Sequence, residues 1–222
     1  NRLVRVSGPD VMTLDSYRSK VAFIVTPFAK AVAALHLTPN ACTVLALLAA
    51  AASGIFFGLG ETLIAVVLVL VSAFFDAIDG AVARLTGIAS PAGDYLDHVF
   101  DRYADIFIIT GIFAWGTSAW TCEVPAWAIG VFAMTGVLMS SYLGTQAQAV
   151  GLKRNYGGIL GRADRLVLLM VFGAVEVVVP SPLFLGLPAL GWLLVIFGVF
   201  GHVTAVQRFV SGWRELNAPR KE

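Results

Sequence analysis

Long runs of apolar residues, separated by short polar stretches, dominate the chain. Each run is close to the roughly 20 residues that an α-helix needs to cross the hydrocarbon core of a bilayer. The runs show no alternation of polar and apolar positions, which favours helices over a transmembrane β-barrel. The pattern predicts six spanning helices, at residues 41–59, 61–85, 94–118, 124–150, 163–180 and 185–210.

Segment 13–36 differs from these runs. Arg18, Lys20 and Lys30 interrupt it, and the pair Thr26-Pro27 is expected to break it. Such mixing of charged and apolar positions is typical of an amphipathic helix lying at the membrane interface. The sequence therefore predicts an all-α integral membrane protein with one domain over residues 1–222, in which this helix precedes a six-helix bundle at about 41–210.

The composition supports a membrane protein. Of the 222 residues, 58% are hydrophobic and 13% are charged, whereas a soluble domain is about 45–50% apolar and about 25% charged. These values exclude a disordered chain, a nucleic-acid-binding domain and an ordinary cytosolic enzyme. The net charge of +1 creates no strong field that would attract an anionic partner.

The basic residues predict the orientation in the membrane. The connections near 59–61, 119–123 and 180–184 contain none of the 15 Lys and Arg residues. All of them fall at 2–30, 84–102, 153–165 and 208–221. Because cytoplasmic loops are enriched in Lys and Arg, we expect these regions and both termini at the cytoplasmic face of the cell membrane.

Six aspartates occupy two consecutive predicted spans: Asp76, Asp79, Asp94, Asp97, Asp101 and Asp105. A carboxylate at membrane depth costs several kcal/mol unless it is paired or bound to metal. Asp76 and Asp79 share a helix face, and so do Asp97 and Asp101, because they are three and four residues apart. A short link joins the two spans, so we expect antiparallel neighbours whose cytoplasmic ends bring the four carboxylates together.

Four converging carboxylates form a hard-oxygen site that suits Mg²⁺ or Mn²⁺. Arg84 and Arg102 lie beside them, and cations next to such a cluster indicate a phosphate-bearing substrate. A transporter with an acidic ion pathway and an intramembrane prenyltransferase with Asp-rich helix ends are the alternatives. Asp94 and Asp105 have a simpler interpretation, in which they pair with Arg102 or cap a helix.

The spacing of residues 76–101 distinguishes between these classes. It reads D-x2-D-G-x2-A-R-x8-G-x3-D-x3-D, with fixed members Asp76, Asp79, Gly80, Ala83, Arg84, Gly93, Asp97 and Asp101. This pattern resembles the signature of the CDP-alcohol phosphotransferase family at every fixed position. The resemblance implies an interfacial helix before six spans, a homodimer, and transfer of a substituted phosphate from a CDP-linked donor to an alcohol with release of CMP.

The resemblance also implies roles for individual residues. Asp76 and Asp97 would bridge two Mg²⁺ or Mn²⁺ ions, Asp79 would bind the first ion, and Asp101 would bind the second and act as general base. The CDP moiety of the lipid would be contacted by Asn40, Thr43, Gly80, Ala83, Arg84, Ser90 and Gly93.

The acceptor alcohol is predicted from the region after the fourth span. Its basic residues include Arg162 and Arg165, which share a helix face at the start of the fifth span and suggest an acceptor that carries phosphate. The stretches MTLDSYR, SYLGTQAQA and GILGRADRL resemble archaeal members of the family that join CDP-archaeol to inositol phosphate. Gln146 is a third candidate for acceptor binding. Glycerol phosphate, serine and free inositol stay open as alternative acceptors, and CDP-diacylglycerol as an alternative donor.

Overall fold

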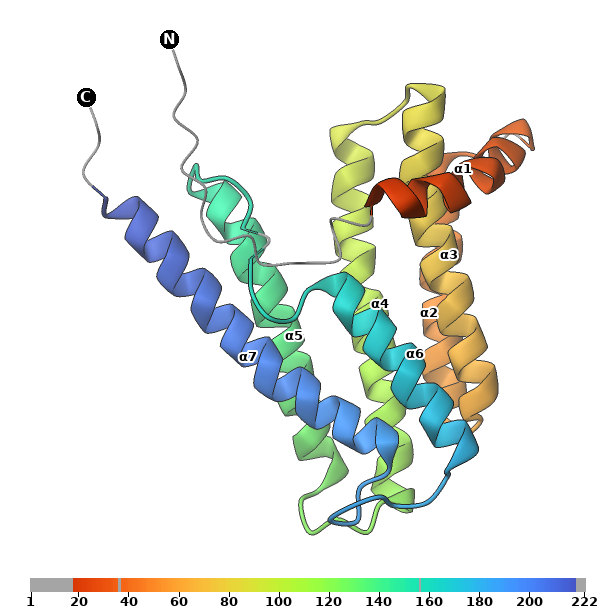
Figure 1. Cartoon of the computed structure of the whole chain (residues 1–222), viewed down its shortest axis with the longest axis vertical. Helices are drawn as coiled ribbons and strands as arrows, with labels where there is room; N and C mark the ends of the chain where they lie inside the picture. The colour runs from red at the N-terminus through yellow and green to blue at the C-terminus, as the bar shows by residue number, and fades with distance from the viewer. Residues whose placement is uncertain (1–17, 36, 156, 219–222) are drawn as a thin grey trace.

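The computed structural model describes residues 18–35, 37–155 and 157–218, which form seven helices and no β-strand. A first helix, α1 (Arg18–Ala34), precedes six that run back and forth along one axis (Figure 1). These six are α2 (Pro39–Gly58), α3 (Thr62–Thr86), α4 (Pro91–Ala119), α5 (Ala126–Ala149), α6 (Arg162–Val178) and α7 (Ala189–Leu216). The all-helical prediction is confirmed. α7 begins four residues later than predicted, because Phe184 and Leu187 close a turn before it.

Four helices, α2, α3, α5 and α7, are long and apolar enough to cross a membrane. The other two predicted spans fall short of that description. Charged residues occupy the first half of α4, and α6 has 17 residues. Both of these helices carry residues of the candidate site.

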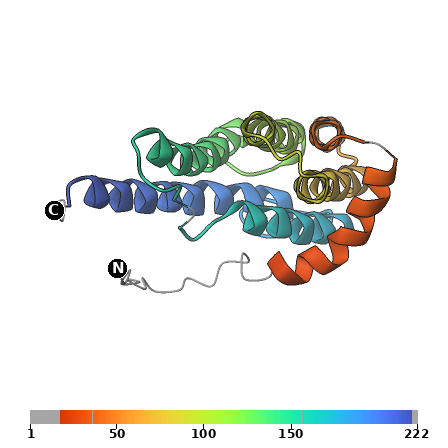
Figure 2. The same cartoon turned by 90° about the horizontal axis from the view of Figure 1, so that it is seen from above.

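Helix α1 lies across the bundle rather than along it, so that Figure 2 shows it lengthwise while α2 and α3 are seen end-on. Ala29 is fully buried against Ile78 and Val82 of α3. The predicted break at Thr26-Pro27 is wrong, because α1 continues through Pro27. A proline removes one helical hydrogen bond, and the packing of Ala29 holds the helix together around it. Residues 13–17 and 36 of the predicted helix lie outside the described residues.

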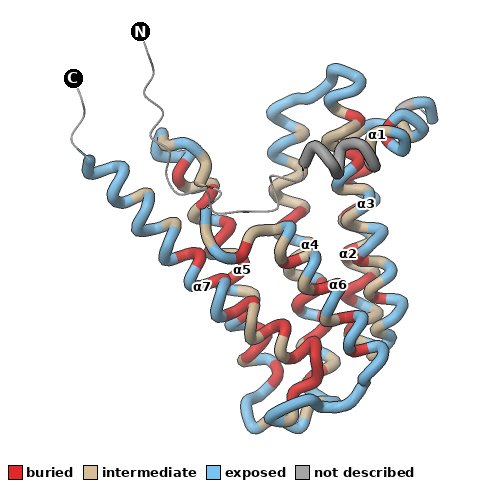
Figure 3. The backbone as a smooth tube through the Cα atoms, in the orientation of Figure 1, coloured by how far each residue is buried: buried red, intermediate tan, exposed pale blue. Residues whose placement is uncertain are grey.

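The main core draws on all six helices from α2 to α7, and includes Phe57, Ile112, Val137 and Leu194. Figure 3 shows buried residues gathered on the inward sides of the helices and exposed residues along the flanks. The exposed flanks are rich in large apolar side chains, which is typical of a surface that faces lipid rather than water.

Glycines bring α2 and α4 into backbone contact. A Cβ atom added at Gly111 would collide with the backbone of Gly54, whereas one added at Gly58 would meet its nearest atoms at 3.9 Å. Gly111→Ala is expected to destabilise the protein by about 1–3 kcal/mol through overpacking. The matched variant Gly58→Ala should be neutral or slightly stabilising, since alanine favours the helix. Thermal unfolding midpoints in detergent check this, and equal midpoints would contradict the tight crossing.

Candidate active site

The turn between α3 and α4 is built from local capping signals. Gly87 ends α3 in the left-handed conformation, with φ 70°, which glycine adopts at little cost. Three residues later Ser90 is the N-cap of α4, where its Oγ accepts a hydrogen bond from the Gly93 amide at 3.1 Å, and Pro91 is the first helical residue. The chain therefore reverses within four residues and places the C-terminal end of α3 beside the N-terminal end of α4.

The antiparallel helices α3 and α4 bring their acidic ends together as predicted. Along their length both helices pack against α2 rather than against each other, and α6 packs against α3. A small cavity lies between the acidic ends of α3 and α4. Its lining consists of Thr43, Ala46, Leu47, Ser72, Asp76, Asp97, Phe100, Asp101, Ala104 and Arg162.

Three of the four predicted metal-binding carboxylates converge in space. Asp76, Asp79 and Asp97 each offer an oxygen atom, and these oxygens lie within 4.8 Å of one another. Thr43 of α2 donates a hydrogen bond of 2.7 Å to Asp79 Oδ2, and both residues are buried. The Thr43 hydroxyl orients this carboxylate, and its predicted contact with CDP stays a prediction.

Asp101 lies one helical turn beyond Asp97 and is 8% exposed. Arg162 from the start of α6 joins it to Asp76: Nη2 donates to Asp76 Oδ1 at 3.0 Å, and Nη1 pairs with Asp101 Oδ1. Arg102 Nη2 lies 3.7 Å from Asp101 Oδ2. One guanidinium therefore links acidic residues of two different helices at the cavity wall.

A second ion-pair cluster lies one turn further along α4. Arg165, 5% exposed, donates to Asp105 Oδ2 at 3.0 Å, and Arg102 Nε lies 3.6 Å from the same atom. The interpretation of Asp105 as a partner of Arg102 is confirmed, and Arg165 is an additional partner. Asp94 lies in the first turn of α4, 3.5 Å from His98 Nε2.

Five of the residues predicted to contact CDP lie in two small groups near the turn between α3 and α4. A Cβ at Gly93 would lie 3.4 Å from Ser90 Oγ and 3.6 Å from Asn40 Oδ1. The Arg84 guanidinium lies over Gly80, where an added Cβ would be 3.3 Å from Nη1. Neither glycine has a side chain that would fill the space around these polar groups.

Contacts that secure the connection between α5 and α6 had no signal in the sequence. Arg208 of α7 donates to the carbonyls of Gly157, at 2.8 Å, and Ser140, while Thr204 accepts from the Leu160 amide at 3.1 Å. Arg154 contacts His98 of α4.

Gln146 lies in the last turns of α5, and within the described part of the chain no hydrogen bond joins its side chain to the acids.

The acidic residues suit a divalent cation. Asp97 Oδ1 is buried and has no hydrogen-bond partner among the described residues, which leaves a lone pair free for a ligand. Asp97, His98 and Asp101 form a second group whose ligand atoms lie within 4.8 Å of one another. Carboxylate oxygens dominate both groups, and such sets favour hard cations.

Comparisons with known proteins agree with this geometry. Residues 36–209 match the CDP-alcohol phosphatidyltransferase family, so the chain belongs to that family. An archaetidylinositol phosphate synthase of Pyrococcus horikoshii is 31% identical over 167 residues, covering 74% of this chain and 85% of the relative.

Two crystal structures of the Mycobacterium tuberculosis phosphatidylinositol phosphate synthase are similar in fold. One, with CDP-DAG bound, superposes with a TM-score of 0.75 at 28% identity and covers 86% of this chain and 94% of that one. The other, in complex with manganese and citrate, has a TM-score of 0.72 at 26% identity over 85% and 88% of the two chains. The chain is thus a CDP-alcohol phosphotransferase embedded in a membrane by several apolar helices.

Proposed function

We propose that this enzyme transfers a substituted phosphate from a CDP-linked lipid, CDP-archaeol or CDP-diacylglycerol, to inositol phosphate and releases CMP. The observation that carries the proposal is the cavity at which the motif acids of α3 and α4 converge beside Arg162. The archaeal relative's name and the CDP-DAG bound to the mycobacterial enzyme support this choice of donor and acceptor.

Two divalent cations, Mg²⁺ or Mn²⁺, would be held by the four acids of the motif. Asp76 and Asp97 would contribute to both ions, Asp79 to the first and Asp101 to the second. When bound, such ions neutralise the diphosphate and stabilise the departing CMP. The manganese in the mycobacterial structure supports this assignment, and so does Asp97 Oδ1, which has no hydrogen-bond partner in the described part of the chain.

Asp101 would act as general base. In the transfer, the acceptor hydroxyl oxygen forms a bond to the phosphorus that carries the lipid, the bond to the CMP oxygen breaks, and the hydroxyl proton passes to Asp101. A base within hydrogen-bond reach is needed because an alcohol is a weak nucleophile at neutral pH. Asp101 lines the cavity, in a position to serve as this base. Asn40, Thr43, Gly80, Ala83, Arg84, Ser90 and Gly93 would bind the CDP moiety.

Arg162 and Arg165 would hold the acceptor phosphate, with Gln146 nearby. Arg162 lines the cavity, and although Arg165 pairs with Asp105, its Nε is buried with no hydrogen-bond partner among the described residues. Each charge-assisted hydrogen bond contributes roughly 1.5–3 kcal/mol. Arg162→Ala and Arg165→Ala should therefore raise the KM for inositol phosphate about ten- to a hundredfold.

The KM for the CDP-lipid should change little in either variant, and Lys153→Ala, in the exposed connection, is the matched control. CMP release is measured with inositol phosphate, glycerol phosphate, inositol and serine as acceptors. If both arginine variants leave the acceptor KM unchanged, the phosphate subsite is wrong and an unphosphorylated acceptor becomes the better assignment. Faster turnover with glycerol phosphate than with inositol phosphate would support the phosphate subsite but assign glycerol phosphate as the acceptor.

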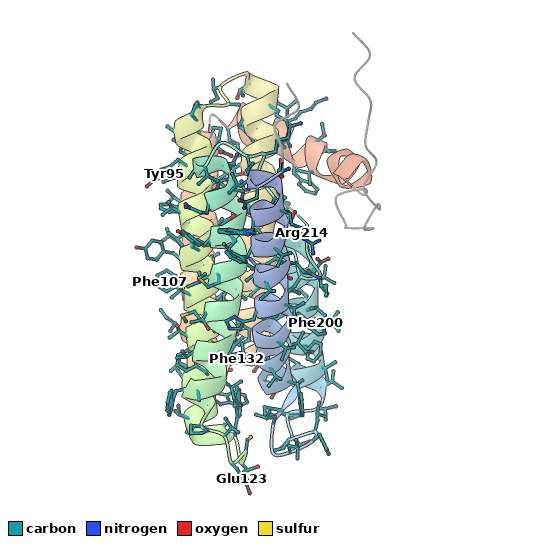
Figure 4. The ribbon with its side chains drawn as sticks, turned by 90° about the vertical axis from the view of Figure 1, so that its left-hand side faces the viewer. Tyr95, Phe107, Glu123, Phe132, Phe200 and Arg214 are labelled. Atoms are coloured by element: carbon teal, nitrogen blue, oxygen red, sulfur yellow. The ribbon has the colours of Figure 1, made fainter. Side chains whose placement is uncertain are left out.

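The membrane arrangement is part of the proposal. Six spans, α2 to α7, would cross the cell membrane, with α1 at the interface and residues 1–222 forming one domain. The acidic end of the bundle, near Tyr95 in Figure 4, would face the cytoplasm with both termini, and the end near Glu123 would face outside. The distribution of Lys and Arg supports this orientation. Family resemblance supports a homodimer.

A further inference from the structure

Arg162 holds the carboxylates that the proposed cations need. Its guanidinium pairs with Asp76 Oδ1 at 3.0 Å and with Asp101 Oδ1. The other two acids form no ion pair with Arg162 among those of the described residues: Asp79 accepts a hydrogen bond from Thr43 at 2.7 Å, and Asp97 lies 3.8 Å from His98 Nδ1. Arg162 therefore contacts one acid of α3 and one of α4, and occupies the space between the two helices.

We infer that Arg162 and a divalent cation compete for Asp76 and Asp101, and that the acceptor phosphate relieves this competition by binding Arg162. The inference rests on the proposed function, since it assigns a regulation to the same site. A guanidinium and a metal ion repel each other, and Arg162 occupies Oδ1 of both carboxylates. A cation that uses these two oxygen atoms therefore has to displace Arg162 from them.

A phosphate group is the partner that Arg162 would bind after leaving. Its oxygens accept hydrogen bonds from the planar guanidinium as a carboxylate does. Arg102, which also approaches Asp101, is not equivalent, because its Nε lies 3.6 Å from Asp105 and that pair extends to Arg165. Arg162 has no such second anchor among its described ion pairs, which join it only to Asp76 and Asp101.

The exchange makes binding of the two ligands reciprocal. If an acceptor phosphate tightens cation binding by a given factor, the cation tightens phosphate binding by the same factor. An alcohol without phosphate has no means of drawing Arg162 away. Arg162 would thus favour phosphorylated alcohols in two ways. It would bind the acceptor phosphate directly, and its departure from Asp76 and Asp101 would complete the cation site.

The experiment measures Mn²⁺ affinity, by electron paramagnetic resonance of free Mn²⁺, for the purified full chain in detergent. Arg162→Gln should bind Mn²⁺ about five- to tenfold more tightly than the wild type, since it loses two partly screened charge-assisted pairs. The Mn²⁺ affinity of Arg162→Lys should lie between those of the wild type and Arg162→Gln, because a lysine keeps the charge but cannot bridge both carboxylates. Lys153→Gln, which removes an equal charge from the exposed connection, should stay within about twofold.

Inositol phosphate should tighten Mn²⁺ binding several-fold in the wild type, whereas free inositol should not, and Arg162→Gln should show no such response. Equal or weaker Mn²⁺ binding by both Arg162 variants, with Asp97→Asn losing the ion, would overturn the inference and leave the proposed cation site intact. If the wild type binds Mn²⁺ no better than Asp97→Asn, the cation site itself is refuted and the inference with it.

Discussion

Asp101→Asn is expected to lower the rate of CMP release about a thousandfold at saturating Mn²⁺, because general-base catalysis contributes roughly 10²–10⁴-fold. An asparagine keeps the size of the side chain and its place in the cavity wall, but it cannot take the hydroxyl proton. Affinity for the CDP-lipid should stay within a few-fold of the wild type. High Mn²⁺ is needed because Asp101 is also assigned to the second ion, and a weakened ion would otherwise imitate the loss of a base.

Asp76→Asn is the contrasting variant, since Asp76 would contribute to both ions. It should lose turnover and CDP-lipid affinity together, because the ions would hold the diphosphate. Single-turnover rates and nucleotide affinity, measured on the same preparations, separate the two effects. Normal turnover by Asp101→Asn would refute its assignment as the base, and equal losses of affinity in both variants would assign Asp101 to cation binding alone.

The apolar runs predict the helices well, because the length and hydropathy of a segment largely determine whether it forms a helix in a bilayer. The run at 163–180 is α6 (Arg162–Val178), and the run at 61–85 is α3 (Thr62–Thr86). The pairing of helices was harder to predict. A short link makes α3 and α4 antiparallel, but it does not make them pack together, and small residues decide which surfaces approach. Gly54 and Gly111 bring α4 against α2, and a small cavity lies between the acidic ends of α3 and α4.

The motif predicts where the acids gather, since its spacings place them on matching helix faces at the two ends of one turn. It does not predict what holds them in place. Thr43 reaches Asp79 across 36 residues of sequence, and Arg162 reaches Asp76 across 86. Such contacts depend on the packing of α2 and α6 around the cavity, which local periodicity does not encode. The basic residues of 153–165 indicate a phosphate ligand, whereas the structure shows that Arg162 is already engaged with the acids.

Removal of divalent metal should abolish activity. The motif site is made of carboxylates, and without a cation Asp76, Asp79 and Asp97 would repel the negative diphosphate of the donor. Chelation by EDTA should therefore reduce CMP release to background, and Mg²⁺ or Mn²⁺ should restore it. Ca²⁺ is a useful comparison, because it prefers longer bonds and more ligands than Mg²⁺ does.

The most direct test of the enzyme assignment is CMP release by the purified chain in vesicles that contain a CDP-linked lipid, with inositol phosphate and Mn²⁺ outside. We expect CMP and a phosphorylated inositol lipid in equal amounts, with no product after exhaustive chelation and full recovery when Mn²⁺ returns. No CMP with any of the four acceptors, or undiminished CMP release after chelation, would contradict metal-dependent phosphotransfer at the α3–α4 carboxylates.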